Sequence, residues 1–212
     1  MFKRNQVEQA IGQILEPRSA KLSSTLRSRI RRLLETDRRF SRSKRSTDPG
    51  RANFAFFRSN MPGRGAENWF SEYEAFALLT GLRLMQHAWP QGFVVALLRR
   101  VRPELEKEHT RISTQGSACL FDQQVIQQRA KSGDMAVQNT DPVFLGIISA
   151  DPNGPRGSNP AAICRGQQRL LDFLRTYGVG RTLTSYELVN SARALSGALA
   201  ETRPRKRGRT RE

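Results

Sequence analysis

The longest stretch of apolar positions at helical spacing lies between residues 71 and 102 and predicts two helices. Apolar side chains recur every three or four positions, at Phe76, Leu79, Leu82 and Met85 and then at Phe93, Val94, Leu97, Leu98 and Val101. Ser71 and Glu74 have the spacing of a capping box at the start of the first helix. Residues 88–90, Ala-Trp-Pro, break the pattern, and a proline is tolerated in the first turn of a new helix. We therefore expect a helix-turn-helix pair at the centre of a domain.

Two shorter amphipathic helices are predicted before this pair. Asn5 and Glu8 repeat the capping pattern ahead of an apolar face that ends at Pro17. Residues 23–39 follow, with one apolar face formed by Leu26, Ile30, Leu33 and Leu34. Its other faces carry Arg27, Arg29, Arg31, Arg32, Arg38 and Arg39. The helix has too few acidic residues to form an ion pair with each of these arginines.

The aromatic runs at residues 53–58 and 67–70 predict two short strands. The turn-forming residues 60–65 lie between them, so a β-hairpin with basic side chains at Arg58 and Arg64 is expected. Such a hairpin is typical of the wing of a DNA-binding domain, which contacts the backbone. The alternative is that this segment extends the core, and the phenylalanines at 54, 56 and 57 are expected to be buried there.

The second half of the chain predicts a small α+β domain. Residues 143–150, 161–165 and 181–189 have the composition of strands, and residues 123–129, 167–177 and 191–201 that of helices. We expect a mostly antiparallel sheet of about three strands. Pro103 should interrupt the preceding helix, which leaves residues 104–112 as a separate surface helix.

The predicted fold class is mainly α with an α+β C-terminal part: a winged helix-turn-helix, in which two helix pairs flank a β-hairpin, followed by the three-stranded domain. The expected boundaries are residues 1–112 for a DNA-binding domain, 113–202 for a domain that binds a ligand or a partner, and 203–212 for a basic disordered tail.

Charge narrows the possible functions. The chain of 212 residues has a net charge of +17, which indicates a polyanionic partner. Residues 1–48 contain thirteen basic and five acidic side chains, and residues 203–212 contain six and one. The tail is too polar to fold and is expected to contact phosphate or a minor groove. A solvated, solubilising surface is the alternative for both regions.

The N-terminal half resembles the winged helix-turn-helix DNA-binding domain of the MerR family. The similarity lies in the order of parts: a short helix, a helix that begins Ser23-x-Thr25-Leu26-Arg27 and continues to Arg31, a hairpin, and a second helix pair that opens at residues 70–74 and turns near Trp89. The resemblance implies that the second helix contacts DNA. The family's metal-sensing cysteines have no counterpart here, so no metal response is implied. The family's long dimerisation helix is not expected either, because of Pro103.

Catalytic and metal-binding patterns are weak. Cys119 and Cys164 are far apart, with no histidine at ligand spacing. His87 and His109 have no nucleophile at a typical spacing, and the three glutamates at 104, 106 and 108 diverge on a helix. The glycine-rich segments near residues 62 and 154 lack the remainder of a nucleotide-binding motif. We expect no catalytic activity, no cofactor and no metal.

We therefore predict a sequence-specific double-stranded DNA-binding protein, either a transcriptional regulator or a mobile-element factor. The expected DNA contacts are Lys21, Ser23, Thr25, Arg27, Arg29, Arg31, Arg58, Arg64, Arg203, Arg205, Lys206 and Arg207. Arginine can contact guanine through two hydrogen bonds, and serine, threonine and lysine contact backbone oxygens.

Further expectations concern location and partners. No segment has the length of a membrane span or the pattern of a secretory signal, so a cytoplasmic, nucleoid-associated protein without membrane contact is expected, with a homodimer as an open possibility. An adaptor for RNA or protein, which uses the basic helix and the C-terminal sheet, is the main alternative. An enzyme is the third.

Overall fold

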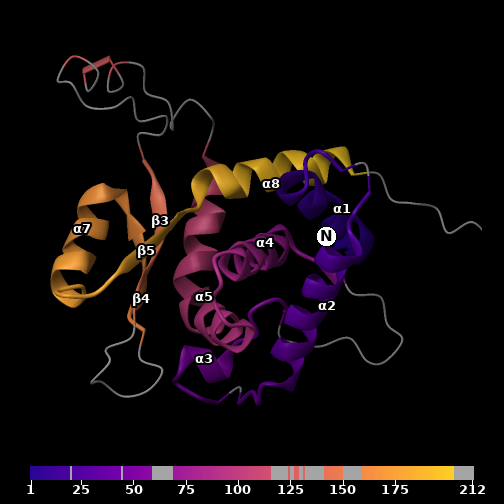
Figure 1. Cartoon of the computed structure of the whole chain (residues 1–212), viewed down its shortest axis with the longest axis horizontal. Helices are drawn as coiled ribbons and strands as arrows, with labels where there is room; N and C mark the ends of the chain where they lie inside the picture. The colour runs from indigo at the N-terminus through magenta and orange to yellow at the C-terminus, as the bar shows by residue number, and fades with distance from the viewer. Residues whose placement is uncertain are drawn as a thin grey trace, which may run out of the picture. The chain divides into compact units, whose positions relative to one another are not determined.

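The computed structural model describes residues 1–19, 21–43, 45–58, 69–115, 141–149 and 159–202, and the isolated positions 124, 127, 128 and 131. Its elements, in chain order, are β1 (Phe2–Lys3), α1 (Arg4–Leu15), α2 (Ser24–Arg39), α3 (Pro49–Ala52), β2 (Trp69–Phe70), α4 (Glu72–Gln86), α5 (Gln91–Thr114), β3 (Val143–Ile148), β4 (Ala161–Arg165), α7 (Gly166–Tyr177), β5 (Leu183–Glu187) and α8 (Val189–Glu201). The described part is mainly helical with two small antiparallel sheets (Figure 1).

The chain forms two compact units. Unit 1 consists of residues 1–102 and 193–212, and unit 2 of residues 103–192. Helices α5 and α8 each contribute residues to both units. The chain therefore passes from unit 1 to unit 2 after Arg102 and returns to unit 1 at Arg193. The sequence pattern placed the boundaries at residues 112 and 202.

The helices of unit 1 begin where the capping residues predict. The Ser71 hydroxyl accepts a hydrogen bond from the Glu74 N–H at 3.2 Å, and the Glu74 carboxylate accepts one from the Ser71 N–H at 2.7 Å. This capping box opens α4, and most of the side chains of α4 are buried. Ala88 has a φ of 63° in the turn that leads to α5. The predicted two helices with a turn between them are confirmed.

Helix α1 starts earlier than predicted. The cap is at Lys3, whose N–H donates to the Gln6 side chain at 2.9 Å, and Asn5 lies inside the helix. The expectation of an Asn5 cap was therefore wrong. The reason is tertiary: residues 2–3 form strand β1, which is extended up to the first residue of the helix.

The predicted β-hairpin was also wrong in one of its strands. Residues 53–58 form no strand, and β2 instead pairs antiparallel with β1, with Phe2 opposite Phe70. The backbone of residues 54–57 makes hydrogen bonds to side chains of α2 and α5 in place of a neighbouring strand. The phenylalanines at 54, 56 and 57 are buried, as expected.

Helix α5 is continuous from Gln91 to Thr114 with Pro103 inside it, so the predicted interruption was wrong. A proline removes one helical hydrogen bond, yet tertiary packing on both sides of it outweighs that cost. Val101, Arg102, Leu105 and Ile112 are all buried. Residues 104–112 are consequently part of α5 and not a separate surface helix.

Unit 2 contains the predicted three-stranded antiparallel sheet, in the order β4-β3-β5. The central strand β3 places Gly146 against Leu170 and Phe173 of α7, where an added Cβ would lie 3.1 Å from each. Phe144 and Ile148 belong to the same cluster, while the alternate residues of β3 are buried as well. Both sides of the central strand are therefore covered.

The predicted helix around residues 123–129 and the basic tail at 203–212 lie outside the described residues. Among the helices that the structure describes, none combines the length and apolar character needed to cross a membrane.

Candidate functional site

Helix α2 has two sides of opposite character. Leu26, Ile30, Leu33 and Leu34 are buried along one side. The arginines at positions 27, 29, 31, 32, 38 and 39 are all exposed, and at about 100° per residue they spread over roughly 200° of the helix circumference. We call this surface the α2 arginine face. The apolar side fixes the helix in the unit, so the charged side is presented to solvent on a rigid element.

Carboxylates neutralise only a small part of the α2 arginine face. The Arg27 guanidinium lies 4.0 Å from Glu8, and the Arg31 guanidinium lies 3.9 Å from Glu35. These arginine side chains remain 64% and 62% exposed, so the two ion pairs contribute little to the free energy of folding. Within the described ranges, Arg29, Arg32 and Arg39 form no ion pair. The face is a concentrated positive surface.

The start of α2 is fixed by Ser23 and Glu16. The Ser23 hydroxyl accepts from the Leu26 N–H at 3.1 Å and donates to the Glu16 carboxylate at 2.6 Å. The Ser23 N–H donates to the other Glu16 oxygen at 3.0 Å. These hydrogen bonds lower the pKa of Glu16 below its ordinary value. The hydroxyl of Ser23, which the sequence assigned to DNA, is thus already used as the helix cap, whereas Lys21 and Thr25 beside it are exposed.

The C-terminal part of α2 is held by a buried ion pair. Arg99 of α5 donates to Asp37 Oδ1 at 2.6 Å, and both side chains are almost completely buried. The same carboxylate accepts from the backbone N–H groups of Ala55 at 3.1 Å and Phe56 at 3.0 Å. Arg99 also donates to the carbonyl oxygen of Asp37. This arrangement satisfies the charges inside unit 1 and fixes the orientation of α2.

A second buried arginine extends this network. Arg102 donates to the carbonyl oxygens of Phe54 at 2.7 Å and Phe57 at 2.5 Å, and its guanidinium lies 5.1 Å from the Tyr73 ring centre. Glu74 is 3.9 Å from it. The sequence analysis missed Asp37, Arg99 and Arg102. The signal was present for Asp37, which lies at the spacing of the apolar face of α2, where a charged residue needs a buried partner. Arg102 lies at the edge of the apolar face of α5 and Arg99 on the opposite side from it, so neither position carried that signal.

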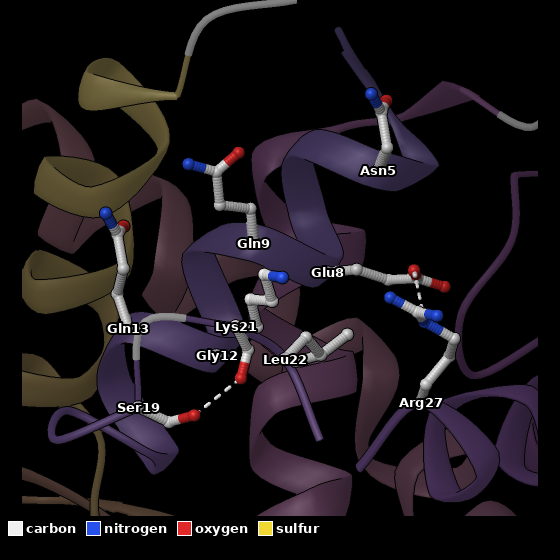
Figure 2. Close-up of a pocket in the computed structure, with 9 residues that line it drawn as sticks. All are labelled: Asn5, Glu8, Gln9, Gly12, Gln13, Ser19, Lys21, Leu22 and Arg27. Atoms are coloured by element: carbon white, nitrogen blue, oxygen red, sulfur yellow. Dashed lines mark hydrogen bonds and ion pairs between the residues drawn. The ribbon is translucent and has the colours of Figure 1, made fainter. Parts of the chain in front are cut away.

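A polar groove lies between α1 and the segment that leads into α2. Its volume is about 590 Å³, and its lining includes Asn5, Gln9 and Gln13 of α1, together with Lys21 and Arg27 (Figure 2). We call it the α1 groove. Because Arg27 lines the groove and also belongs to the α2 arginine face, the two surfaces are continuous.

The remaining predicted contacts are divided between described and undescribed residues. Arg58 is exposed at the end of the segment 45–58. Arg64, Arg203, Arg205, Lys206 and Arg207 lie outside the described residues. The predicted contacts at Lys21, Thr25, Arg27, Arg29 and Arg31 are thus exposed on the first turns of α2 or just before them, with Ser23 at the cap.

Groups with catalytic potential do not converge in the described part of the chain. No group of three or more His, Cys, Asp and Glu side chains there is placed to hold a metal ion. His87 is exposed at the end of α4, while His109 is buried in α5. Burial raises the pKa of the Cys164 thiol, which disfavours the reactive thiolate.

An ion-pair cluster in unit 2 is structural in character. Asp141 accepts from Arg111 at 2.6 Å and from Arg165 at 3.0 Å. Burial raises the pKa of Asp141, but the hydrogen bonds from Arg165 and Arg111 outweigh it, and the net effect is a lowered pKa. The cluster joins the end of α5 to the start of β3 and the end of β4.

Comparison with known proteins returned no match to any family model, to any curated protein or to any solved structure.

Proposed function

We propose that this chain is a sequence-specific double-stranded DNA-binding protein and that α2 is the helix that contacts the bases. The observation that carries the proposal is the α2 arginine face. Its six exposed arginines lie on one side of a helix whose other side is buried. A helix of this kind fits the major groove, where arginine contacts guanine through two hydrogen bonds. Arg27 and Arg31 of this face are assigned to bases. Arg29 of the face is assigned to phosphates, together with Lys21 and Thr25 beside it.

The proposal keeps part of the resemblance to the MerR-type winged helix-turn-helix, namely its helices without the wing. Helices α1 and α2 would be the DNA-contacting pair, and α4 and α5 the supporting pair. A wing built from residues 53–58 is not part of it, because these residues form no strand. Arg58 is retained as an exposed cation that contacts the DNA backbone. A transcriptional regulator or a mobile-element factor associated with the nucleoid is the role that fits such a protein.

The adaptor alternative assigns the activity to the C-terminal sheet. RNA recognition on a sheet uses exposed aromatic side chains on which bases stack. Both sides of the central strand β3 are covered in the structure. This observation favours the helix over the sheet as the nucleic-acid contact.

The first experiment measures binding of fluorescent duplex DNA, single-stranded DNA and RNA by anisotropy at several salt concentrations. We expect duplex DNA to bind most tightly and its affinity to fall steeply with salt, because phosphate contacts release counterions. A preference for RNA would support the adaptor instead.

The second experiment tests sequence specificity with Arg27→Ala. We expect a loss of about 1–3 kcal/mol on the preferred duplex and a relaxed preference at one base pair. Arg27→Lys keeps the charge but not the two-point contact with guanine, so it should lose the preference and keep most of the salt dependence. Arg175→Ala is the matched control, since Arg175 is an exposed helical arginine, 3.5 Å from Asp172, in unit 2. An equal loss on all duplexes for Arg27→Ala would remove the claim of specificity.

A further inference from the structure

Three side-chain amides form a row on α1. Asn5, Gln9 and Gln13 are four residues apart, so they lie on one side of the helix with a spacing of about 6 Å along its axis. Figure 2 shows all three leaving the helix on the same side. They are exposed, and their side-chain amides make no hydrogen bond to another described residue. Their donors and acceptors are consequently free for a ligand.

The opposite wall of the α1 groove carries positive charge. Lys21 and Arg27 line it. Among the described lining residues the acidic side chain is that of Glu8, which accepts from Arg4 at 2.7 Å and lies 4.0 Å from Arg27. The charge of Glu8 is thereby balanced within unit 1. The groove as a whole favours an anionic ligand.

Close packing keeps the two walls in place. A Cβ atom added at Gly12 would lie 2.8 Å from Leu22 Cδ1, so α1 and the segment before α2 touch where glycine leaves room. The groove is therefore a feature of the folded unit that needs no rearrangement to form.

The chemistry of the groove fits a nucleotide. A side-chain amide offers one acceptor beside one donor, which is the pattern that matches N6 and N7 of adenine, and lysine and arginine match phosphate. The amide spacing of about 6 Å is close to two base steps of DNA, about 6.8 Å. Most of the described residues that line the groove have polar or charged side chains, which disfavours the usual hydrophobic small molecule.

We propose that the α1 groove is a second base-contacting surface, which binds adenine edges through Gln9 and Gln13 while Lys21 holds an adjacent phosphate. The inference rests on the proposed DNA-binding function and deepens it. The site recognised by the protein then contains A·T pairs beside the guanine contacted from α2. Arg27 connects the two parts of the surface.

The test compares the DNA sites that wild-type protein and the variants Gln9→Ala and Gln13→Ala select from a random duplex pool. Alanine favours the helix, so neither variant should disturb folding, and thermal unfolding checks this. Each variant is expected to lose the preference for A·T at one position, with a drop of about tenfold in the affinity ratio between A·T and G·C there. Gln167→Ala, an exposed helical glutamine of α7, is the matched control and should change nothing.

A chemical probe gives a second readout. Replacing the critical adenine by 7-deazaadenine removes the N7 acceptor and should weaken wild-type binding to the level of the glutamine variant. The same replacement should have no effect on that variant. If both variants select the wild-type site, or lose affinity equally on all sequences, the inference is overturned while the effects of Arg27→Ala leave the proposed function standing. If wild-type protein binds no duplex, the proposed function fails first.

Discussion

Unit 1 uses arginine in two opposite ways. Arg99 and Arg102 are buried in α5, where a carboxylate and several carbonyl oxygens accept their hydrogen bonds. The arginines of α2 are exposed and have few carboxylate neighbours. The two buried arginines stabilise the fold, and the exposed arginines of α2 are available to a partner. The high net charge of the chain therefore includes both buried arginines with hydrogen-bond acceptors and exposed arginines.

The comparison also shows how α2 is held in place for the contact with DNA that we propose. Its apolar side packs in the core, its first turn is capped by Ser23, and its last turn is held by Asp37 and Arg99. A base contact needs a side chain whose helix does not move. Arg99 thus supports the exposed arginines of α2 through Asp37.

The largest effect is expected from breaking the buried pair. Asp37→Ala leaves the Arg99 charge buried without its carboxylate and leaves the N–H groups of Ala55 and Phe56 without their acceptor. We expect a loss of about 3–5 kcal/mol in the free energy of unfolding, measured by urea denaturation. Glu35→Ala, which removes the exposed partner of Arg31, should change it by less than about 0.5 kcal/mol.

The double variant Asp37→Ala, Arg99→Ala tests whether the two residues act as a pair. Its loss should be clearly smaller than the sum of the two single losses. Additive losses would show that Arg99 and Asp37 act independently, and the contrast between buried and exposed arginines would lose its basis.

A smaller effect is expected at Ser23, which the sequence assigned to DNA and the structure places at the helix cap. Ser23→Ala should lower the free energy of unfolding by about 1 kcal/mol, while Ser23→Thr keeps the hydroxyl and most of the stability. The preferred DNA sequence should be the same for both. Weaker DNA binding without any loss of stability would instead assign the hydroxyl to a phosphate.

The smallest effect is expected at the ion-pair cluster around Asp141, whose exposure is intermediate between the buried Asp37–Arg99 pair and the exposed arginines of α2. Because its pKa is lowered in the folded state, the Asp141 charge stabilises the fold above its ordinary pKa of about 4, and this contribution is lost as the pH falls through the lower folded-state value. Wild-type protein should therefore lose more stability on acidification below about pH 4 than Asp141→Asn does. Identical acid profiles in thermal unfolding would contradict the role of Arg111 and Arg165.

The local sequence pattern was sufficient to predict most helices and strands, because apolar spacing and capping residues within a few positions determine them. The apolar spacing of residues 23–39, the Ser71–Glu74 box and the three β-rich runs of unit 2 each predicted an element that the structure contains. The exposed arginines followed from the same spacing, since they occupy the positions that the apolar face of α2 leaves. Amphipathic periodicity determines both sides of a helix at once.

Only the tertiary structure decided what depends on distant partners. Residues 53–58 have the composition of a strand, but Asp37 and Arg102 satisfy their backbone and β1 takes the place beside β2. Helix α5 continues through Pro103 because buried residues on both sides of it stabilise the helical form. The α1 groove likewise exists because α1 packs against Leu22. Contacts between residues far apart in the chain have no local signature, so burial and pairing appear only when the elements are packed together.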